Sequence, residues 1–141
     1  MKKVNRMYKK ISITIPLKPI TKKNSQQILV NRSTGRPFIA PSKQYKQYEK
    51  DAGYFIKPKG LKIDYPVNVK CLYYMPTHRK VDLTNLLNAT LDMLCFYDII
   101  KDDNRNIVYS VDGSKVLFDK ENPRTEIIIT AIDGAETWGR K

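Results

Sequence analysis

Four of the five aspartates in one apolar, helix-patterned segment, KVDLTNLLNATLDMLCFYDIIKDD, which runs from Lys80 to Asp103, are candidates for shared chemistry. They are Asp82, Asp92, Asp102 and Asp103. Carboxylates held near each other repel, and Mg²⁺ relieves that repulsion by taking hard oxygen ligands in octahedral geometry. On a bound phosphodiester, such an ion can polarise the phosphate and activate water. Together, the four aspartates therefore indicate metal-assisted hydrolysis of a phosphodiester.

Each aspartate also has an ordinary structural explanation. Asp82 or Thr84 can cap the helix by accepting hydrogen bonds from its free backbone N–H groups, and the positive helix end favours an ionised Asp82. Asp92 can be a solvated helix residue, and Asp102 and Asp103 can form an acidic turn. Only the combination of the four, within a basic protein, favours a metal site.

The positive charge of the chain is concentrated near the N-terminus. The formal net charge is +12 over 141 residues. The first fifty residues hold thirteen Lys or Arg against one acid, Glu49, whereas the two signs balance from Asp51 onward. A basic surface of this kind attracts phosphate backbones. We therefore expect DNA as the partner, with a merely solubilising surface and an RNA- or membrane-associated domain as the alternatives.

Several other classes of protein are excluded by the composition. Cys71 and Cys95 are far apart and His78 is the only histidine, so we expect reduced cysteines and no zinc site. No Gly-rich phosphate loop is present, which argues against a nucleotide or other small-molecule cofactor. The basic N-terminus leads into a short alternating run that ends in Pro, and no stretch reaches transmembrane length. We expect a cytoplasmic protein with no membrane partner.

The elements that position the aspartates follow from hydrophobic periodicity and turn residues. We predict, in chain order, a strand over residues 10–17, a hairpin or flap over 21–42, a helix over 43–56, a strand over 67–75, a helix within 80–103 that ends near Phe96 and Tyr97, a hairpin over 106–118 and a strand over 124–132. Ser42 is placed to cap the first helix, and Asp112-Gly113 marks the turn of the second hairpin. Tyr45 and Tyr48 have the helical spacing of core residues.

These elements predict a single α+β domain with a mixed β-sheet and two main α-helices. The domain covers residues 1–141, with a core at about 10–131 and flexible tails at 1–9 and 133–141. In the second helix, the leucines and Met93 fall on one side. Asp82, Asn85, Asn88 and Asp92 fall on the other, so the polar face is narrow.

The residues around this helix resemble the signature of the RusA-type Holliday-junction resolvases, small endonucleases common in phages and prophages. That signature runs roughly D-x-D-N-L-x-K, then an amphipathic helix, then D-D. The present chain has DLTNLLN over residues 82–88, LDML over 91–94 and Asp102-Asp103. A first strand ending in Pro, a Lys/Asn-rich flap and a Tyr-rich helix agree as well. The similarity covers about residues 10–131.

The resemblance implies a homodimer that cuts four-way DNA junctions symmetrically with Mg²⁺ or Mn²⁺. Two of the family's active-site residues carry over, as Asp82 and Asp103, and we expect these two to bind the metal and to share one ion. We also expect Asp102 and Asp92 to assist in catalysis. Thr84 stands where the family has a second Asp, and Asn88 stands where it has Lys. Asp92 is a candidate for the missing carboxylate, and Lys80, Arg79 or Lys101 for the missing charge. A catalytically inactive junction-binding protein of the same fold is the competing hypothesis.

Basic residues outside the acidic segment are the candidates for DNA binding. Those of the flap and of the loop before the second helix are Lys22, Lys23, Arg32, Arg36, Arg79 and Lys80. A polar flap can lie along a DNA backbone or insert at a junction, which makes the first four the strongest group. His78 is either a phosphate contact or a solvated loop residue, and Phe96 and Tyr97 are candidates for core or dimer contacts.

Overall fold

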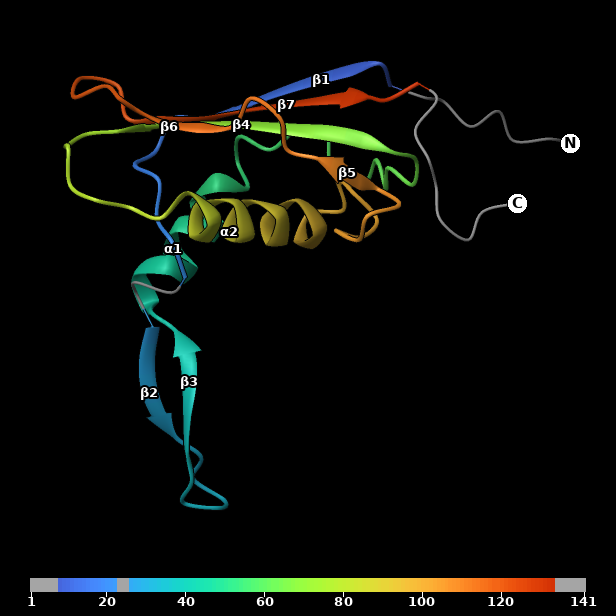
Figure 1. Ribbon diagram of the computed structural model, residues 1–141. Helices are drawn as coiled ribbons and strands as arrows, with labels where there is room; N and C mark the ends of the chain where they lie inside the picture. Colours follow the sequence, from blue (N-terminus) through green and yellow to red (C-terminus); the bar gives the residue numbers. More distant parts are fainter. Residues whose placement is uncertain (1–7, 23–25, 134–141) are drawn as a thin grey trace, which may run out of the picture.

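A computed structural model describes residues 8–22 and 26–133 of the chain. The described part forms a single α+β domain with two helices, a five-stranded mixed sheet and a separate two-stranded hairpin (Figure 1). In chain order, the elements are β1 Lys10–Ile15, β2 Gln26–Val30, β3 Pro37–Pro41, α1 Lys43–Ala52, β4 Val67–Met75, α2 Leu83–Phe96, β5 Val108–Ser110, β6 Lys115–Phe118 and β7 Arg124–Ala131. The predicted fold class is confirmed.

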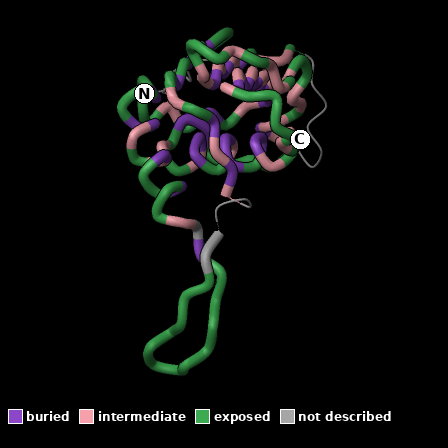
Figure 2. The backbone as a smooth tube through the Cα atoms, turned by 90° about the vertical axis from the view of Figure 1, so that its left-hand side faces the viewer, coloured by how far each residue is buried: buried purple, intermediate pink, exposed green. Residues whose placement is uncertain are grey.

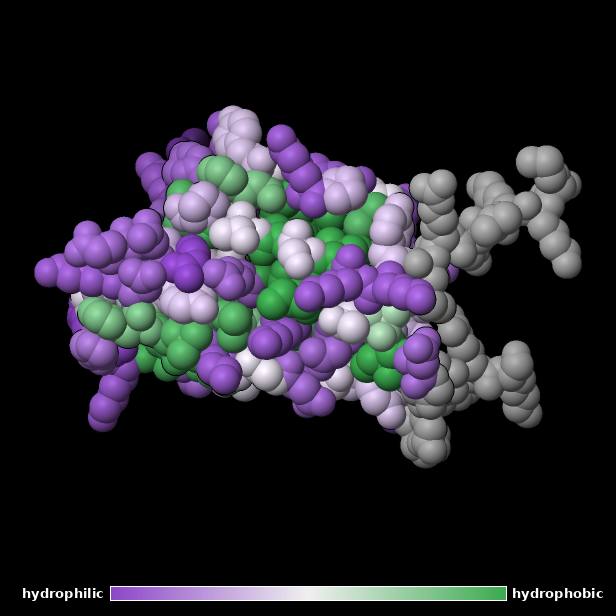
Figure 3. Space-filling view, turned by 90° about the horizontal axis from the view of Figure 1, so that it is seen from above, coloured by the Kyte–Doolittle hydropathy of each residue, from purple (hydrophilic) through white to green (hydrophobic). Residues whose placement is uncertain are grey.

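The sheet is built around β7 and β4. β7 pairs antiparallel with β1 on one side and with β4 on the other, and β5 and β6 both pair parallel with the remaining edge of β4. β4 alternates buried and half-buried side chains over its whole length, because one sheet face packs against the helices. Both helices lie on that same face (Figure 1). The opposite face carries half-buried apolar side chains such as Leu72 and Ile128 among polar ones (Figure 3).

The core lies between the sheet and the two helices. The inward side chains of β1 are Ile11, Ile13 and Ile15, which become more deeply buried along the strand, at 9%, 3% and 0% exposed. Tyr45 and Tyr48 of α1 face the same core at 1% and 7% exposed, which confirms their predicted packing role. The strict alternation of β1 is therefore what fixes which face of this strand is covered.

Ile15 should be among the most costly core positions to truncate. The Ile15→Ala variant removes a fully buried side chain and leaves a cavity, so we expect it to lower the free energy of unfolding by about 2–5 kcal/mol. Thr14→Ala on the exposed face of the same strand should change it by less than about 0.5 kcal/mol. Urea unfolding followed by circular dichroism measures both. Equal losses for the two variants would contradict the assigned strand register.

The first helix is shorter than predicted. Ser42 caps it as expected, with its hydroxyl accepting from the Tyr45 N–H at 3.1 Å, but the helix ends at Ala52 rather than at residue 56. Gly53 follows, and a Cβ at this position would lie only 2.5 Å from the Tyr97 hydroxyl. That hydroxyl donates to the Glu49 carbonyl at 2.6 Å. The close approach of Tyr97 to the helix end thus requires a glycine there.

The predicted hairpin over residues 106–118 is wrong, although both of its strands exist. β5 and β6 do not pair with each other; both run along β4, at Val67–Asn68 and at Leu72–Met75 respectively. Among the central turn residues, only Gly113 has a positive φ, at +85°. A two-residue hairpin of type I′ needs positive φ at both central residues, so this turn does not reverse the chain.

The hairpin of β2 and β3 is confirmed and projects from the body of the domain (Figures 1 and 2). Asn31 organises its tip: the Asn31 side chain accepts from the Ser33 N–H at 2.9 Å, and its carbonyl accepts from the Gly35 N–H at 2.7 Å. Gly35 takes a positive φ of 69°. Residues 28–39 are all exposed, including apolar Ile28 at 75% and Ile39 at 67%. The hairpin thus presents both of its faces to the surroundings.

Candidate active site and DNA-binding surface

Asp82 lies at the N-cap position of α2, but its carboxylate does not cap the helix. Instead, the Thr84 hydroxyl donates a hydrogen bond to Asp82 Oδ1 at 2.9 Å. Asp82 is exposed, and among the described residues Thr84 is the one that donates to its side chain. The capping explanation for Asp82 is therefore wrong. Its second oxygen accepts no hydrogen bond from the described residues.

Asp102 and Asp103 lie close to the other end of α2. Asp102 is held in a local turn, because its side chain accepts from the Asp103 N–H at 2.7 Å and from the Asn104 amide at 3.2 Å. Within the described part of the chain, no group donates a hydrogen bond to the Asp103 carboxylate, which is exposed. Of this pair, Asp103 is thus the more available ligand for a cation.

Cys95 lies in the last turn of α2, and the pKa of its thiol shows which carboxylates are nearby. Burial is the main cause that raises the pKa of this thiol to about 11, and the charges of Asp103, Asp102 and Asp92 raise it further. These three aspartates therefore surround one end of the helix. Asp82 contributes nothing to this shift and lies at the opposite end.

One chain does not bring Asp82 and Asp103 together around a single ion, contrary to the expectation for the metal ligands. The fourteen residues of α2 separate the two ends by about 21 Å at the rise of an α-helix. In Figure 1 the chain enters α2 at one end and leads from the other end toward β5. Among residues 8–22 and 26–133, no group of three His, Cys, Asp or Glu side chains is arranged to hold a metal. The sequence could not reveal this separation, because helix length becomes a distance only after folding.

Asp92 is committed to an ion pair with Lys22. The Lys22 ammonium lies 2.9 Å from Asp92 Oδ2 and 5.6 Å from the centre of the Tyr45 ring. Asp92 therefore acts here as a partner for the segment that leads into the β2–β3 hairpin. Asn88 and Asp92 are four residues apart and are therefore neighbours on one face of the helix.

The expected DNA-binding residues are distributed over two regions. Arg32 and Arg36 are exposed at the tip of the β2–β3 hairpin, and Arg79 and Lys80 are exposed in the loop before α2. Lys22 joins the hairpin to α2 through Asp92, and Lys23 lies outside the described residues. His78 stacks on Phe118, with ring centres 3.9 Å apart and planes inclined by 17°. Phe96 is 64% exposed, so it belongs to the surface of the chain and not to its core.

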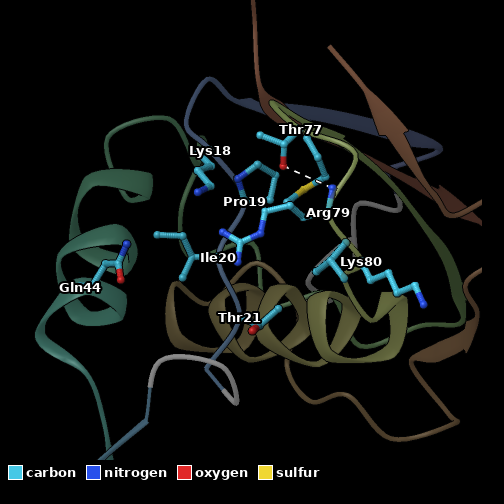
Figure 4. Close-up of a pocket in the computed structure, with 10 residues that line it drawn as sticks. Lys18, Pro19, Ile20, Thr21, Gln44, Thr77, Arg79 and Lys80 are labelled. Carbon is cyan, nitrogen blue, oxygen red and sulfur yellow. Dashed lines mark hydrogen bonds between the residues drawn. The ribbon is translucent and has the colours of Figure 1, made fainter. Parts of the chain in front are cut away.

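A pocket of about 460 Å³ lies beside the start of α2 (Figure 4). Arg79 and Lys80 line it, and so do Lys18 after β1 and Gln44 in the first turn of α1. Val81 also lines the pocket. Asp82 is the next residue in the chain, which places the pocket beside this candidate metal ligand. Lys18 and Gln44 were not among the site residues predicted from the sequence. In the sequence, Lys18 is only a basic residue after an apolar strand, and Gln44 is only a polar residue in a helix. Neither feature reveals that the two residues share a pocket.

A second, smaller hollow of about 300 Å³ adjoins Asp102. Lys101, Asn104 and Asp64 contribute to its lining, and Asp64 comes from the segment before β4. Asn106 Oδ1 is buried there without a hydrogen-bond partner among the described residues. Asp64 is a further acid near the second end of α2, and its distance in sequence kept it out of the predicted site.

The described helices include none with the length and apolar character needed to span a membrane. No curated protein matches the chain. The family model for Endodeoxyribonuclease RusA matches residues 16–130, which include the Asp82 motif, α2, Asp102 and Asp103. Because this match covers most of the chain, the protein belongs to the RusA endodeoxyribonuclease family.

Proposed function

We propose that the protein is a metal-dependent endonuclease that cleaves four-way DNA junctions by phosphodiester hydrolysis in recombination and repair. The observation that carries this proposal is the RusA family match over residues 16–130, which spans the acidic motif. In support, Asp82 and Asp103 are exposed carboxylates with few protein partners, and exposed basic residues occupy both the hairpin tip and the loop before α2. The free thiols of Cys71 and Cys95 suit a reducing cytoplasm.

We further propose that the active unit is a homodimer, with each metal site shared between two chains. Asp82 of one copy would meet Asp103 of the other, assisted by Asp102, because a two-fold axis can bring opposite ends of α2 side by side. Hard carboxylate oxygens from both chains fit Mg²⁺ or Mn²⁺. Such an ion, when bound, polarises the scissile phosphate and favours ionisation of its bound water. The chain's own residues supply the ligands and hold the DNA strand through their positive charges.

A labelled synthetic four-way junction, incubated with Mg²⁺, Mn²⁺ or EDTA, tests this function. We expect paired symmetric nicks with either metal and none in EDTA, because carboxylates alone cannot neutralise the phosphate. A linear duplex of the same sequence is the control substrate and should remain intact. Cleavage that is unaffected by EDTA would contradict the metal requirement.

The competing proposal is a catalytically inactive junction-binding protein. Thr84 and Asn88 favour it, because a neutral hydroxyl is a poorer metal ligand than a carboxylate and an amide supplies no fixed positive charge. Prolonged incubation with Mn²⁺ that yields tight junction binding and no products would select it. Binding to RNA or anionic lipid vesicles at least as tight as binding to junction DNA would instead select a different partner.

A further inference from the structure

Three segments that are distant in the sequence meet at the 460 Å³ pocket beside α2. The first, residues 18–21, follows β1; the second is Gln44 in α1; the third is the loop from β4 to α2. In Figure 4 the Arg79 guanidinium extends toward Ile20 and Gln44, whereas Lys80 points away along α2. The Arg79 N–H donates to Thr77 Oγ1 at 3.4 Å, which helps to hold this loop (Figure 4). The pocket is thus shaped by the fold and not by one continuous motif.

The lining of this pocket combines positive charge with neutral hydrogen-bonding groups. Lys18 and Arg79 supply the charge, and none of the ten lining residues, all of them in the described part, is acidic. Gln44 and Thr77 add neutral polar groups. The buried Pro19 and Met75 form an apolar wall, and attraction between charges is stronger beside such a wall than in open water.

We propose that this pocket binds one backbone phosphate of the DNA strand that passes Asp82. A guanidinium can donate two parallel hydrogen bonds to phosphate oxygens, and Lys18 adds a point charge from the opposite segment. Val81 lines the pocket and Asp82 is the next residue, so a strand anchored here runs past the candidate metal ligand. The inference rests on the DNA-binding function proposed above, and it assigns Lys18 and Gln44 to the DNA surface.

The salt dependence of binding tests this site, because each phosphate contact releases counterions. We expect Lys18→Ala and Arg79→Ala each to reduce the slope of log K against log salt by about 0.7–0.9. The double variant should show a similar reduction and not twice as much, since both side chains hold the same phosphate. Fluorescence anisotropy of a labelled junction in EDTA measures these slopes without cleavage.

Lys115→Ala is the matched control, because it removes the same charge from an exposed residue of β6 outside the pocket. Its slope should equal that of the wild-type protein. Equal losses for Lys115→Ala and Arg79→Ala, or additive losses in the double variant, would overturn the shared phosphate site. Affinity that appears only for single strands carrying a 5′-phosphate would overturn a backbone ligand in favour of a terminal phosphate.

The binding slopes, taken together with the junction-cleavage assay in Mg²⁺ or Mn²⁺, separate this inference from the proposed activity. If the wild-type protein binds junctions without cutting them, and the pocket variants still lose one contact, the pocket is supported and the nuclease function fails. If the wild-type protein cuts junctions and the pocket variants bind like Lys115→Ala, the nuclease function is supported and the pocket fails.

Discussion

A heterodimer of Asp82→Asn with Asp103→Asn should cleave junctions, although neither variant does so alone. Each homodimer lacks a carboxylate in both sites, and the loss should exceed the roughly 100-fold that outer-shell partners of a metal typically cost. In the heterodimer, one site keeps Asp82 from one chain and Asp103 from the other. We therefore expect about half of the wild-type nicking rate from a two-fold symmetric dimer with one intact site.

Co-expression with two different affinity tags, followed by purification through both, gives the heterodimer. A supercoiled plasmid with an extruded cruciform then separates the outcomes, because paired cuts give linear DNA and a single cut gives a nicked circle. We expect nicked circles. A heterodimer as inactive as its parents would contradict a site shared between chains.

The reciprocal control pairs a wild-type chain with a chain that carries both substitutions. If each site is shared, both sites of this heterodimer lack one carboxylate and no cleavage is expected. If each site lies within one chain, the wild-type chain keeps a complete site and cleavage persists. Junction binding in EDTA should be unchanged in all combinations, which excludes misfolding as the cause.

Thr84→Asp should strengthen metal-dependent cleavage. Thr84 Oγ1 now donates to Asp82 Oδ1 at 2.9 Å and so occupies one lone pair of a candidate metal ligand. A carboxylate in its place adds a second hard oxygen and removes that donor. Because metal affinity rises with the charge of the ligands, we expect half-maximal cleavage at a Mg²⁺ concentration lower by about 10-fold.

Thr84→Asn is the matched control, because Asn has the shape of Asp without its charge. It should leave the Mg²⁺ dependence near that of the wild-type protein. An acid at this position in the first turn of α2 is also compatible with the helix dipole, so thermal stability should not fall. If Thr84→Asp and Thr84→Asn behave alike, Thr84 does not lie at the metal site.

Much of the fold could be predicted from local patterns. The alternation of isoleucines in β1, the Ser42 cap and the apolar stripe of α2 each specify an element without help from the rest of the chain. The predictions of the end of α1 and of the second hairpin were wrong, because residues distant in the sequence determine both. Tyr97 packs against Gly53 at the end of α1, and β4 takes β5 and β6 as separate partners instead of letting them form a hairpin.

By itself, the sequence predicted the class of chemistry and determined the feature on which that prediction rests, a motif of aspartates carried by an amphipathic helix in a strongly basic chain. Residue types and spacing suffice for that, because ionisation and helical periodicity are local properties. Only the tertiary structure decided which groups meet. The length of α2 keeps Asp82 and Asp103 apart. Asp92 forms an ion pair with Lys22, which lies seventy residues earlier in the chain. Three separate segments form the basic pocket. Such distances arise from packing against the sheet, which no local pattern encodes.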